Sequence, residues 1–150
     1  MAAKTERQNT GDLGEAIIEK NCLCPRCKSK GKTLKRLVAN FKCADIICDF
    51  CGFLAQVKTK RSDDINTIDN TIAGAGWNPQ KSRMDAGIYF PLFFVKISKN
   101  GKLFSVFYLP ADYQTPEMFV PSIRNIKNRK PYEMFNYELT DIKKYMVRVV

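Results

Sequence analysis

Residues Cys43 to Lys60 have the sequence CADIICDFCGFLAQVKTK. It contains a C-x-x-C pair, Cys48 and Cys51, between two segments rich in apolar residues. Another pair, Cys24 and Cys27, stands earlier in the chain, with twenty residues between the two pairs. A C-x-x-C turn presents two thiolates at the spacing that tetrahedral zinc requires, and two such turns supply four ligands. The stretch therefore predicts a Cys₄ zinc ribbon.

The zinc-binding element is expected at about residues 22–52, and its zinc should be structural because four thiolates leave no position for water. A thioredoxin-type redox pair and disulfides are the alternative interpretations of these cysteines. The polar N-terminus lacks the apolar region of a signal peptide, so we expect a cytoplasmic, intracellular protein whose thiols stay reduced. Cys22 and Cys43 fall outside the pattern and are expected to be small buried hydrophobes, with metal ligation as the alternative.

The composition limits the class of protein. At 150 residues, with 45% apolar and 11% aromatic residues, the chain fits one globular domain over residues 1–150. The net charge of +10 and the pI of about 9.4 predict a polyanionic partner. Nucleic acid is favoured over a membrane surface, because no long basic amphipathic helix and no bilayer-length apolar run is present. The absence of histidine excludes Ser-His and Cys-His catalysis and any His-ligated metal.

Hydrophobic patterning predicts a mixture of helices and strands. Residues 12–20 are expected to form a short helix capped by Thr10. Two strands are expected at Leu37 to Ile47 and Gly52 to Lys60, joined by the second cysteine pair. Two β-rich runs flank Asn100-Gly101, a strong hairpin dipeptide. The polar segment after Lys60 is expected to be partly helical, and YMVRVV near the C-terminus to form an edge strand.

The two segments that flank Cys48 and Cys51 carry polar side chains that could bind a metal ion or act in catalysis. If residues 44–47 and 53–60 pair antiparallel, Asp45 falls opposite Gln56, and alternation places Gln56, Lys58 and Lys60 on one face. A carboxylate and an amide oxygen can bind a divalent cation, and an ammonium can offset charge on a phosphate. The pattern D-x₁₀-Q-x-K resembles the PD-(D/E)XK nuclease signature. The alternative interpretation of this pattern is a surface strand that carries polar residues without a catalytic role.

The order of elements strengthens this resemblance. TGDLGEAII resembles the G-x-x-x-E helix start of such nucleases, which places a further acidic residue, Glu15, before the sheet. A helix with Glu, a strand with Asp and a strand with (E/Q)-x-K then follow in the order that the superfamily needs.

From about Thr10 to Pro116, the chain resembles the catalytic domain of the DpnI-type restriction endonucleases. The matching segments are CPRC, ADIICDFC, QVKTK and PLFFVKISKNGKLFSVFYLPADYQTP. This resemblance implies an α/β, restriction-endonuclease-like fold, with a central mixed sheet flanked by helices and a Cys₄ zinc ribbon. It also implies zinc ligation and catalytic roles for the matching positions: Cys24, Cys27, Cys48 and Cys51 for zinc, and Asp45, Gln56, Lys58 and Glu15 for catalysis.

Two departures from the family qualify this expectation. Gln56 stands where the DpnI type has glutamate, which removes one negative charge from the metal site. The chain stops at Val150, so the winged-helix domain that follows the nuclease in DpnI has no counterpart in it, and recognition of methylated adenine is not implied.

The expected function is a Mg²⁺-dependent DNA endonuclease. Asp45, Gln56, the Val57 carbonyl and Glu15 would hold the Mg²⁺, and Lys58 would position or activate the attacking water. The zinc would fix the register of the strands that carry the site. A non-catalytic zinc-ribbon DNA-binding protein and a junction-resolvase-type nuclease are the alternatives.

The expected partner is double-stranded DNA, and no membrane interaction is expected. The protein would act as a homodimer or with a separate specificity subunit. The candidate phosphate contacts are basic residues that lie between the two cysteine pairs or at the end of the strand that carries Gln56 and Lys58. They are Lys28, Lys30, Lys32, Lys35, Arg36, Lys60 and Arg61. Further candidates are Arg83, Arg124, Lys127, Arg129 and Lys130. For each of these, ordinary surface solvation is the alternative.

Overall fold

The computed structural model describes residues 3, 5–38, 41, 44–125 and 130–150. Contacts divide the chain into two compact units, each described by itself below. The first unit comprises Met1–Thr67, Phe90–Tyr108 and Val147–Val150, and the second comprises Ile68–Tyr89 and Leu109–Met146. Within the described ranges, no helix is both long enough and apolar enough to cross a membrane. Whether the chain behaves as one domain stays a prediction.

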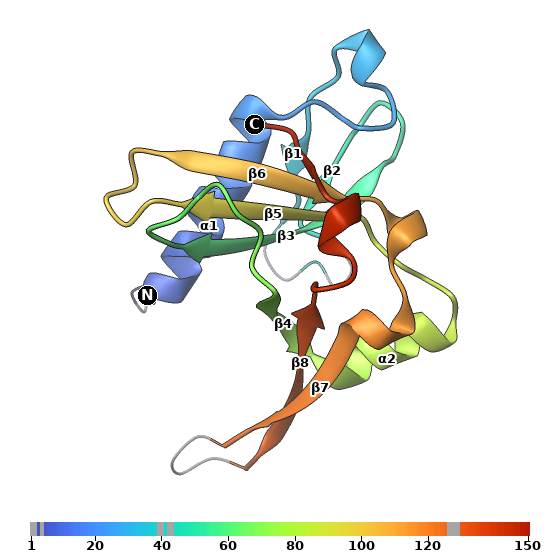
Figure 1. Ribbon diagram of the computed structural model, residues 1–150. Helices are drawn as coiled ribbons and strands as arrows, with labels where there is room; N and C mark the ends of the chain where they lie inside the picture. Colours follow the sequence, from blue (N-terminus) through green and yellow to red (C-terminus); the bar gives the residue numbers. More distant parts are fainter. Residues whose placement is uncertain (1–2, 4, 39–40, 42–43, 126–129) are drawn as a thin grey trace. The chain divides into compact units, whose positions relative to one another are not determined.

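The first unit is built on a mixed six-stranded sheet in the order β1-β2-β3-β5-β6-β9 (Figure 1). The bounds are β1 Lys35–Arg36, β2 Ile46–Ile47, β3 Leu54–Arg61, β5 Leu92–Ile97, β6 Phe104–Leu109 and β9 Val147–Arg148. β2 runs antiparallel to β3, whereas β5 runs parallel to β3. The mixed α/β fold predicted from the sequence is therefore confirmed.

Two local predictions for this sheet are also confirmed. The Asn100-Gly101 turn joins the neighbouring strands β5 and β6, and Gly101 takes the positive φ of 76° that such a turn needs. Ser98 N–H closes the turn by donating to the Leu103 carbonyl at 2.8 Å. The C-terminal segment forms the edge strand β9, antiparallel to β6.

Helix α1, Glu6–Asn21, contains the predicted helix but starts six residues earlier. Thr5, and not Thr10, is its N-cap: the Thr5 hydroxyl accepts from Gln8 N–H, and the Gln8 side chain accepts from Thr5 N–H. The first two turns lack apolar residues, and the first of them is exposed, so apolar periodicity gives no signal for this part of the helix. Thr10 instead lies inside the helix and accepts a hydrogen bond from Arg61 Nε.

The predicted strand from Leu37 to Ile47 was wrong in extent. Among the described residues of this segment, only Ile46–Ile47 form a strand, and β1 lies just before the predicted start. The apolar residues Leu37, Val38 and Phe41 do not form a strand but line a cavity described below. The rest of the segment includes Cys43, which lies outside the described residues.

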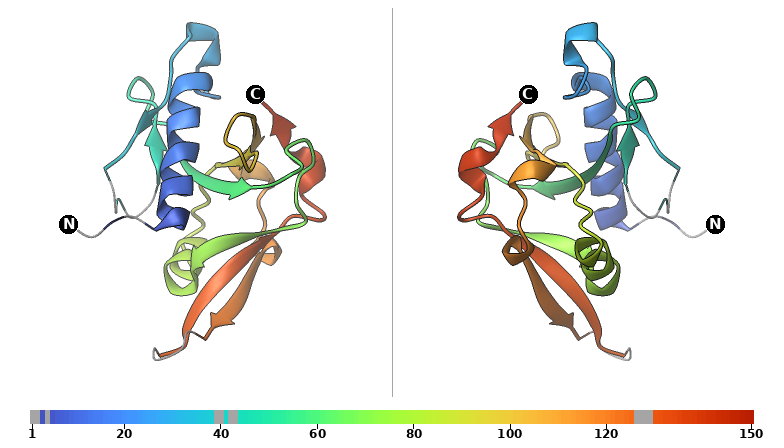
Figure 2. Two further views of the ribbon diagram at one scale, coloured as in Figure 1. Left: turned by 90° about the vertical axis from the view of Figure 1, so that its left-hand side faces the viewer. Right: turned by 90° about the vertical axis from the view of Figure 1, so that its right-hand side faces the viewer.

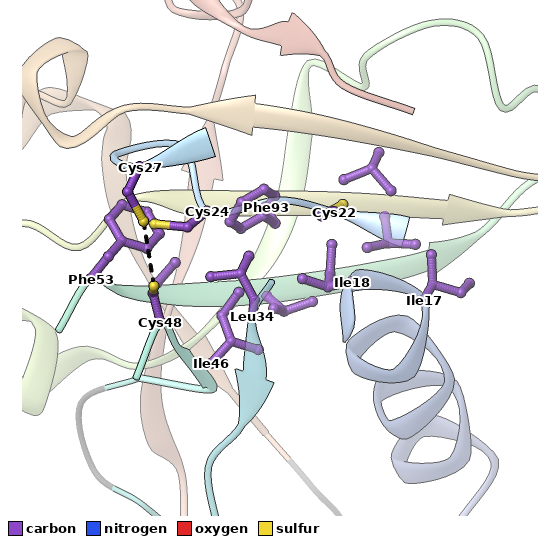
Figure 3. Packing of buried hydrophobic residues seen from close by; sticks show 14 of the residues in the cluster. Ile17, Ile18, Cys22, Cys24, Cys27, Leu34, Ile46, Cys48, Phe53 and Phe93 are labelled. Atoms are coloured by element: carbon purple, nitrogen blue, oxygen red, sulfur yellow. Dashed lines mark hydrogen bonds between the residues drawn. The ribbon is translucent and has the colours of Figure 1, made fainter. Parts of the chain in front are cut away.

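The apolar core of the first unit lies between α1 and the sheet (Figure 3). Ile17 and Ile18 of α1 pack into the same cluster as Val57 of β3 and Phe93 of β5. Figure 3 also shows that the sulfurs of Cys24, Cys27 and Cys48 lie at one end of this cluster, whereas Cys22 lies apart from them. The candidate zinc site is therefore continuous with the core. Cys22 is buried in it, as predicted.

Gly14 allows the close approach of α1 to β3. A Cβ at this position would overlap the Thr59 side chain and lie 2.8 Å from its Cβ. We expect Gly14→Ala to lower the free energy of unfolding by about 1–3 kcal/mol, because overpacking outweighs the gain in helix propensity. Urea denaturation followed by circular dichroism measures this change.

Gly11→Ala is the matched control for Gly14. It lies one turn away in the same helix, and a Cβ added there would meet no atom of the described residues within 4 Å. It should stabilise the protein by up to about 1 kcal/mol. Equal effects of the two substitutions would contradict the close approach.

The second unit contains a three-stranded antiparallel sheet in the order β4-β8-β7 and helix α2 (Figures 1 and 2). The bounds are β4 Thr71–Gly76, α2 Trp77–Asp85, β7 Phe119–Arg124 and β8 Tyr132–Glu138. Short 3₁₀ turns complete the chain: η1 Lys28–Lys30, η2 Ala111–Tyr113, η3 Pro116–Met118 and η4 Lys143–Tyr145. α2 confirms the helix expected in this polar segment.

Candidate active site and zinc cluster

The four predicted zinc ligands come together in the structure. Cys24, Cys27, Cys48 and Cys51 place their Sγ atoms within 4.8 Å of one another. The Sγ atoms of Cys24 and Cys51 are 3.6 Å apart, and those of Cys27 and Cys48 are 3.7 Å apart. Four sulfurs around zinc at about 2.3 Å are separated by about 3.8 Å, so the cluster fits a tetrahedral ion.

Both cysteine turns are closed by backbone hydrogen bonds. Cys24 N–H donates to the Lys32 carbonyl, and Lys30 N–H donates to the Cys27 carbonyl. In the second turn, Cys48 N–H donates to the Phe53 carbonyl and Gly52 N–H to the Cys48 carbonyl. Gly52 has a φ of 78°, which only glycine adopts without strain.

The thiols compete for ionisation when no cation is among them. Burial raises the pKa of Cys27 to about 12, and the neighbouring thiols add to this effect. Burial also opposes ionisation of Cys48, yet hydrogen bonds from the N–H groups of Cys51 and Phe50 lower its pKa to about 7. A divalent cation would let all four sulfurs ionise together.

Asp45 is fixed by its own backbone at the edge of β3. Its N–H donates to the Ala55 carbonyl at 3.0 Å, and its carbonyl accepts from Leu37 N–H at 2.9 Å. β2 pairs Ile46 with Ala55, so the register places Asp45 beside Gln56, as predicted.

The Asp45 carboxylate accepts a backbone hydrogen bond from β3 that a carbonyl of a neighbouring strand would otherwise accept. β2 has only two residues, and beyond it Asp45 Oδ2 accepts from Val57 N–H at 2.8 Å. Ladder hydrogen bonds lie in the plane of a sheet, so this carboxylate lies at the strand edge. Gln56 N–H donates to Pro91 on the β5 side. Because successive residues alternate sides, the Val57 N–H and carbonyl both point toward Asp45.

Glu15 and Asp45 share one cavity of about 200 Å³. Its described lining residues come from α1, the β1 region and the approach to β2: Asp12, Glu15, Arg36, Leu37, Val38, Phe41, Ala44 and Asp45. The Arg36 guanidinium bridges two of the acids, at 3.1 Å from Asp12 Oδ1 and 3.3 Å from Glu15 Oε2. The Arg36 N–H also donates to Glu19, which ties β1 to the helix.

The carboxylates of this cavity repel one another. Burial raises the pKa of Glu15, and the neighbouring negative charge of Asp45 raises it further. The Arg36 guanidinium partly offsets both effects, while Asp12 adds to them. A half-buried carboxylate whose pKa is raised, as at Glu15, next to a second carboxylate favours a bound cation.

Gln56 and Lys58 flank this site on the neighbouring strand. Val57 packs in the core with α1, and Thr59 meets Gly14 of the helix. Alternation along β3 therefore puts Gln56 and Lys58 on the other face of the strand. The structure thus brings Glu15 and Asp45 together and sets Gln56 beside Asp45 at the strand edge. The catalytic roles of all four residues stay predictions.

A comparison with known protein families matches nearly the whole chain. The model of the DpnI, Dam-replacing, family matches residues 2–149. The chain belongs to the Dam-replacing (DpnI) family. This family is restriction-endonuclease-like, which indicates a nuclease that acts on DNA. A comparison with curated proteins found no match.

For this Dam-replacing family member, the predicted phosphate contacts fall into three groups. Around the ribbon, the ammonium groups of Lys30 and Lys32 lie over the Phe50 ring, and Lys35 pairs with Asp49 at 2.7 Å. Lys28 belongs to η1. Arg36 is exposed, but its guanidinium pairs with Asp12 and Glu15 at the acidic cavity.

The second group lies at the far end of β3. Lys60 and Arg61 line a hollow of about 270 Å³ together with Arg7, Thr10 and Thr59. In the second unit, Arg83 donates to the Gln80 side chain, and Lys130 is exposed. Lys127 and Arg129 lie outside the described residues.

Sequence reasoning missed the role of Asp12 and the bridge through Arg36. Asp12 and Glu15 are three residues apart on one helix, so they share a face, and this spacing was the available signal. Arg36 reaches them only because β1 folds back onto α1, which depends on tertiary contacts.

Proposed function

We propose that this protein is a Mg²⁺-dependent endodeoxyribonuclease of the PD-(D/E)XK type, which hydrolyses phosphodiester bonds of double-stranded DNA. The proposal rests on the carboxylates of Glu15 and Asp45, which line one cavity beside β3. Membership in a restriction-endonuclease-like family supplies the class of substrate.

The residues at this edge suit a hard divalent cation. Mg²⁺ prefers oxygen ligands, and Glu15, Asp45 and the Val57 carbonyl would present three of them, with the Gln56 amide beside them. When bound, Mg²⁺ would stabilise charge on the phosphate and lower the pKa of the attacking water. In the cysteine cluster, Zn²⁺ would be structural and hold the turn between β2 and β3.

The chain's own groups would orient the reaction. Lys58, two residues after Gln56 on the same face, would position the attacking water and offset negative charge on the phosphate. Water adds to phosphorus as one P–O ester bond breaks, which leaves a phosphate monoester and a hydroxyl. The zinc cluster would keep Asp45 and β3 in register, since a displacement of about 1 Å can cost about 10²-fold in rate.

Plasmid cleavage tests this function. Zinc-loaded protein should nick or linearise supercoiled DNA in Mg²⁺ or Mn²⁺, and Lys58→Ala should reduce the rate by about 10²–10³-fold because it removes a charge that acts on the transition state. Gel electrophoresis over a time course measures the rate. Lys99→Ala is the control, since Lys99 is an exposed lysine paired with Asp63 at 3.3 Å, far along the sheet from the knuckles.

The outcome also separates the alternatives. DNA binding without nicking in any divalent metal would contradict the proposal and leave a zinc-ribbon DNA-binding protein. Parallel reactions with plain duplex, adenine-methylated duplex and four-way junction DNA distinguish a restriction-type nuclease from a junction resolvase.

A further inference from the structure

The second cysteine turn carries an exposed aromatic side chain at its apex. Phe50 lies between the ligands Cys48 and Cys51 and keeps 53% of its surface exposed. Two hydrogen bonds close this turn around it, from Cys48 N–H to the Phe53 carbonyl and from Gly52 N–H to the Cys48 carbonyl. The ring therefore stands on a rigid support and not on a free loop.

Two lysines from the first cysteine turn meet this ring. Lys30 Nζ lies 4.9 Å and Lys32 Nζ 4.5 Å from the ring centroid. Both backbones are anchored beside ligands, because Lys30 N–H donates to Cys27 and the Lys32 carbonyl accepts from Cys24. We call Lys30, Lys32 and Phe50 the ribbon tip.

The ribbon tip has an excess of positive charge. Asp49, the acid next to Phe50, is paired with Lys35 at 2.7 Å. Two ammonium groups held near one ring repel each other, and each cation–π contact compensates only a little at an exposed site. An anion placed between the two ammonium groups would relieve this repulsion. A phosphate is the anion that a nucleic-acid-binding protein meets.

The ribbon tip is also close to the candidate active site along the chain. Phe50 is five residues from Asp45, and an extended chain spans at most about 3.6 Å per residue, so their Cα atoms are within about 18 Å. Phosphates along one DNA strand are spaced by about 3.4 Å of helix axis, so this distance corresponds to about five nucleotides.

We propose that the ribbon tip is a phosphate-binding site, in which Phe50 positions Lys30 and Lys32 to hold the DNA backbone within about five nucleotides of the bond that is cut. This inference rests on the proposed nuclease function. Phe50 acts here through the lysines and is a positioning residue. Its ring lowers the conformational-entropy cost of ordering the Lys30 and Lys32 side chains when DNA binds.

Salt-dependent binding tests the lysines. The zinc-loaded chain is titrated with duplex DNA in Ca²⁺, which replaces Mg²⁺, over a series of KCl concentrations. Lys30→Gln/Lys32→Gln should make the slope of log K against log [salt] shallower by about 1.8, the value for two phosphate contacts. An unchanged slope overturns the proposal.

Substitutions of the ring test its positioning role. Phe50→Ala should weaken binding about five- to twentyfold, because two lysines must then be ordered on binding. Phe50→Trp should restore the affinity through its π face, whereas Phe50→Leu should not. Wild-type affinity of Phe50→Ala or of Phe50→Leu overturns the inference. Zinc content and circular dichroism verify that each variant is folded.

Crosslinking tests the location. The photoreactive residue p-benzoylphenylalanine at position 50 should crosslink to DNA within about five nucleotides of the cleavage position. The same residue at position 103 is the control, because Leu103 is exposed in the β5–β6 turn, at the other end of β3 and β5. Crosslinks beyond that window overturn the inference. A protein that cuts DNA while Phe50→Ala has no effect refutes only this inference, whereas a protein that cuts no DNA refutes the proposed function.

Discussion

Replacing Cys48 with serine is expected to abolish zinc binding and to leave the first unit largely unfolded. Cys48 is fully buried and follows directly after β2, at the point where the chain turns toward β3. Its sulfur lies 3.7 Å from that of Cys27. A serine hydroxyl is a poor zinc ligand, so the remaining three thiolates would hold the ion far more weakly.

The expected effect is large because the zinc cluster is part of the core. Cys24, Cys27 and Cys48 belong to the same buried cluster as Ile18 and Phe93. Structural zinc contributes about 10–16 kcal/mol in zinc-finger peptides, whereas a whole domain is stable by only about 5–15 kcal/mol. Loss of the ion therefore removes most of the stability of this unit.

Zinc content and far-ultraviolet circular dichroism measure this outcome. The wild-type chain should contain one zinc per molecule and unfold when a chelator removes it. Cys22→Ala is the control, because Cys22 is buried in the same core but is not one of the four clustered zinc ligands, and burial raises its pKa to about 11, so it remains a thiol. That variant should keep its zinc. A folded, zinc-free Cys48→Ser protein would refute a structural role for the ion.

The sequence predicted best those features that depend on short segments. Two C-x-x-C turns define their own ligand geometry, and the short connection after Cys48 fixes the register of β2 and β3. For the same reason, the Asn100-Gly101 turn was predictable, because its dipeptide selects one hairpin conformation. The match to the DpnI family was recognisable from motifs of the same kind.

Features that depend on tertiary contacts were predicted poorly. β4, β7 and β8 form a sheet of their own, and β7 exposes apolar residues such as Val120 and Ile123, so no clear alternation marked it. The start of α1 was missed because its capping box at Thr5 and Gln8 precedes every apolar residue of the helix. The approach of Arg36 to Asp12 and Glu15 joins segments more than twenty residues apart.

Asp45→Asn is expected to reduce DNA cleavage by about 10³-fold or more while the fold is preserved, because it removes a charged ligand of the proposed metal site. Asparagine has the same shape as aspartate, and its side-chain carbonyl can still accept the hydrogen bond from Val57 N–H. The strand edge therefore keeps its partner. A neutral amide, however, binds Mg²⁺ more weakly than a carboxylate does.

Asp45→Ala separates this chemical role from the structural one. Alanine removes the charge and also leaves Val57 N–H without its acceptor, which costs about 1–3 kcal/mol of stability. Both variants should lose cleavage, but only the alanine variant should unfold at lower urea concentration. Asp63→Asn is the control, since Asp63 is an exposed acid whose ion pair with Lys99 contributes little.

Metal binding provides a readout that does not require cleavage. Mn²⁺ titration followed by electron paramagnetic resonance should show weaker binding to Asp45→Asn, because a carboxylate at the cavity has lost its charge. Gln56→Glu should have the opposite effect and tighten Mn²⁺ binding by about tenfold, since it adds a negative charge beside Asp45. Full cleavage activity in Asp45→Asn would exclude this carboxylate as a metal ligand. Its role would then be limited to holding Val57 N–H at the edge of β3.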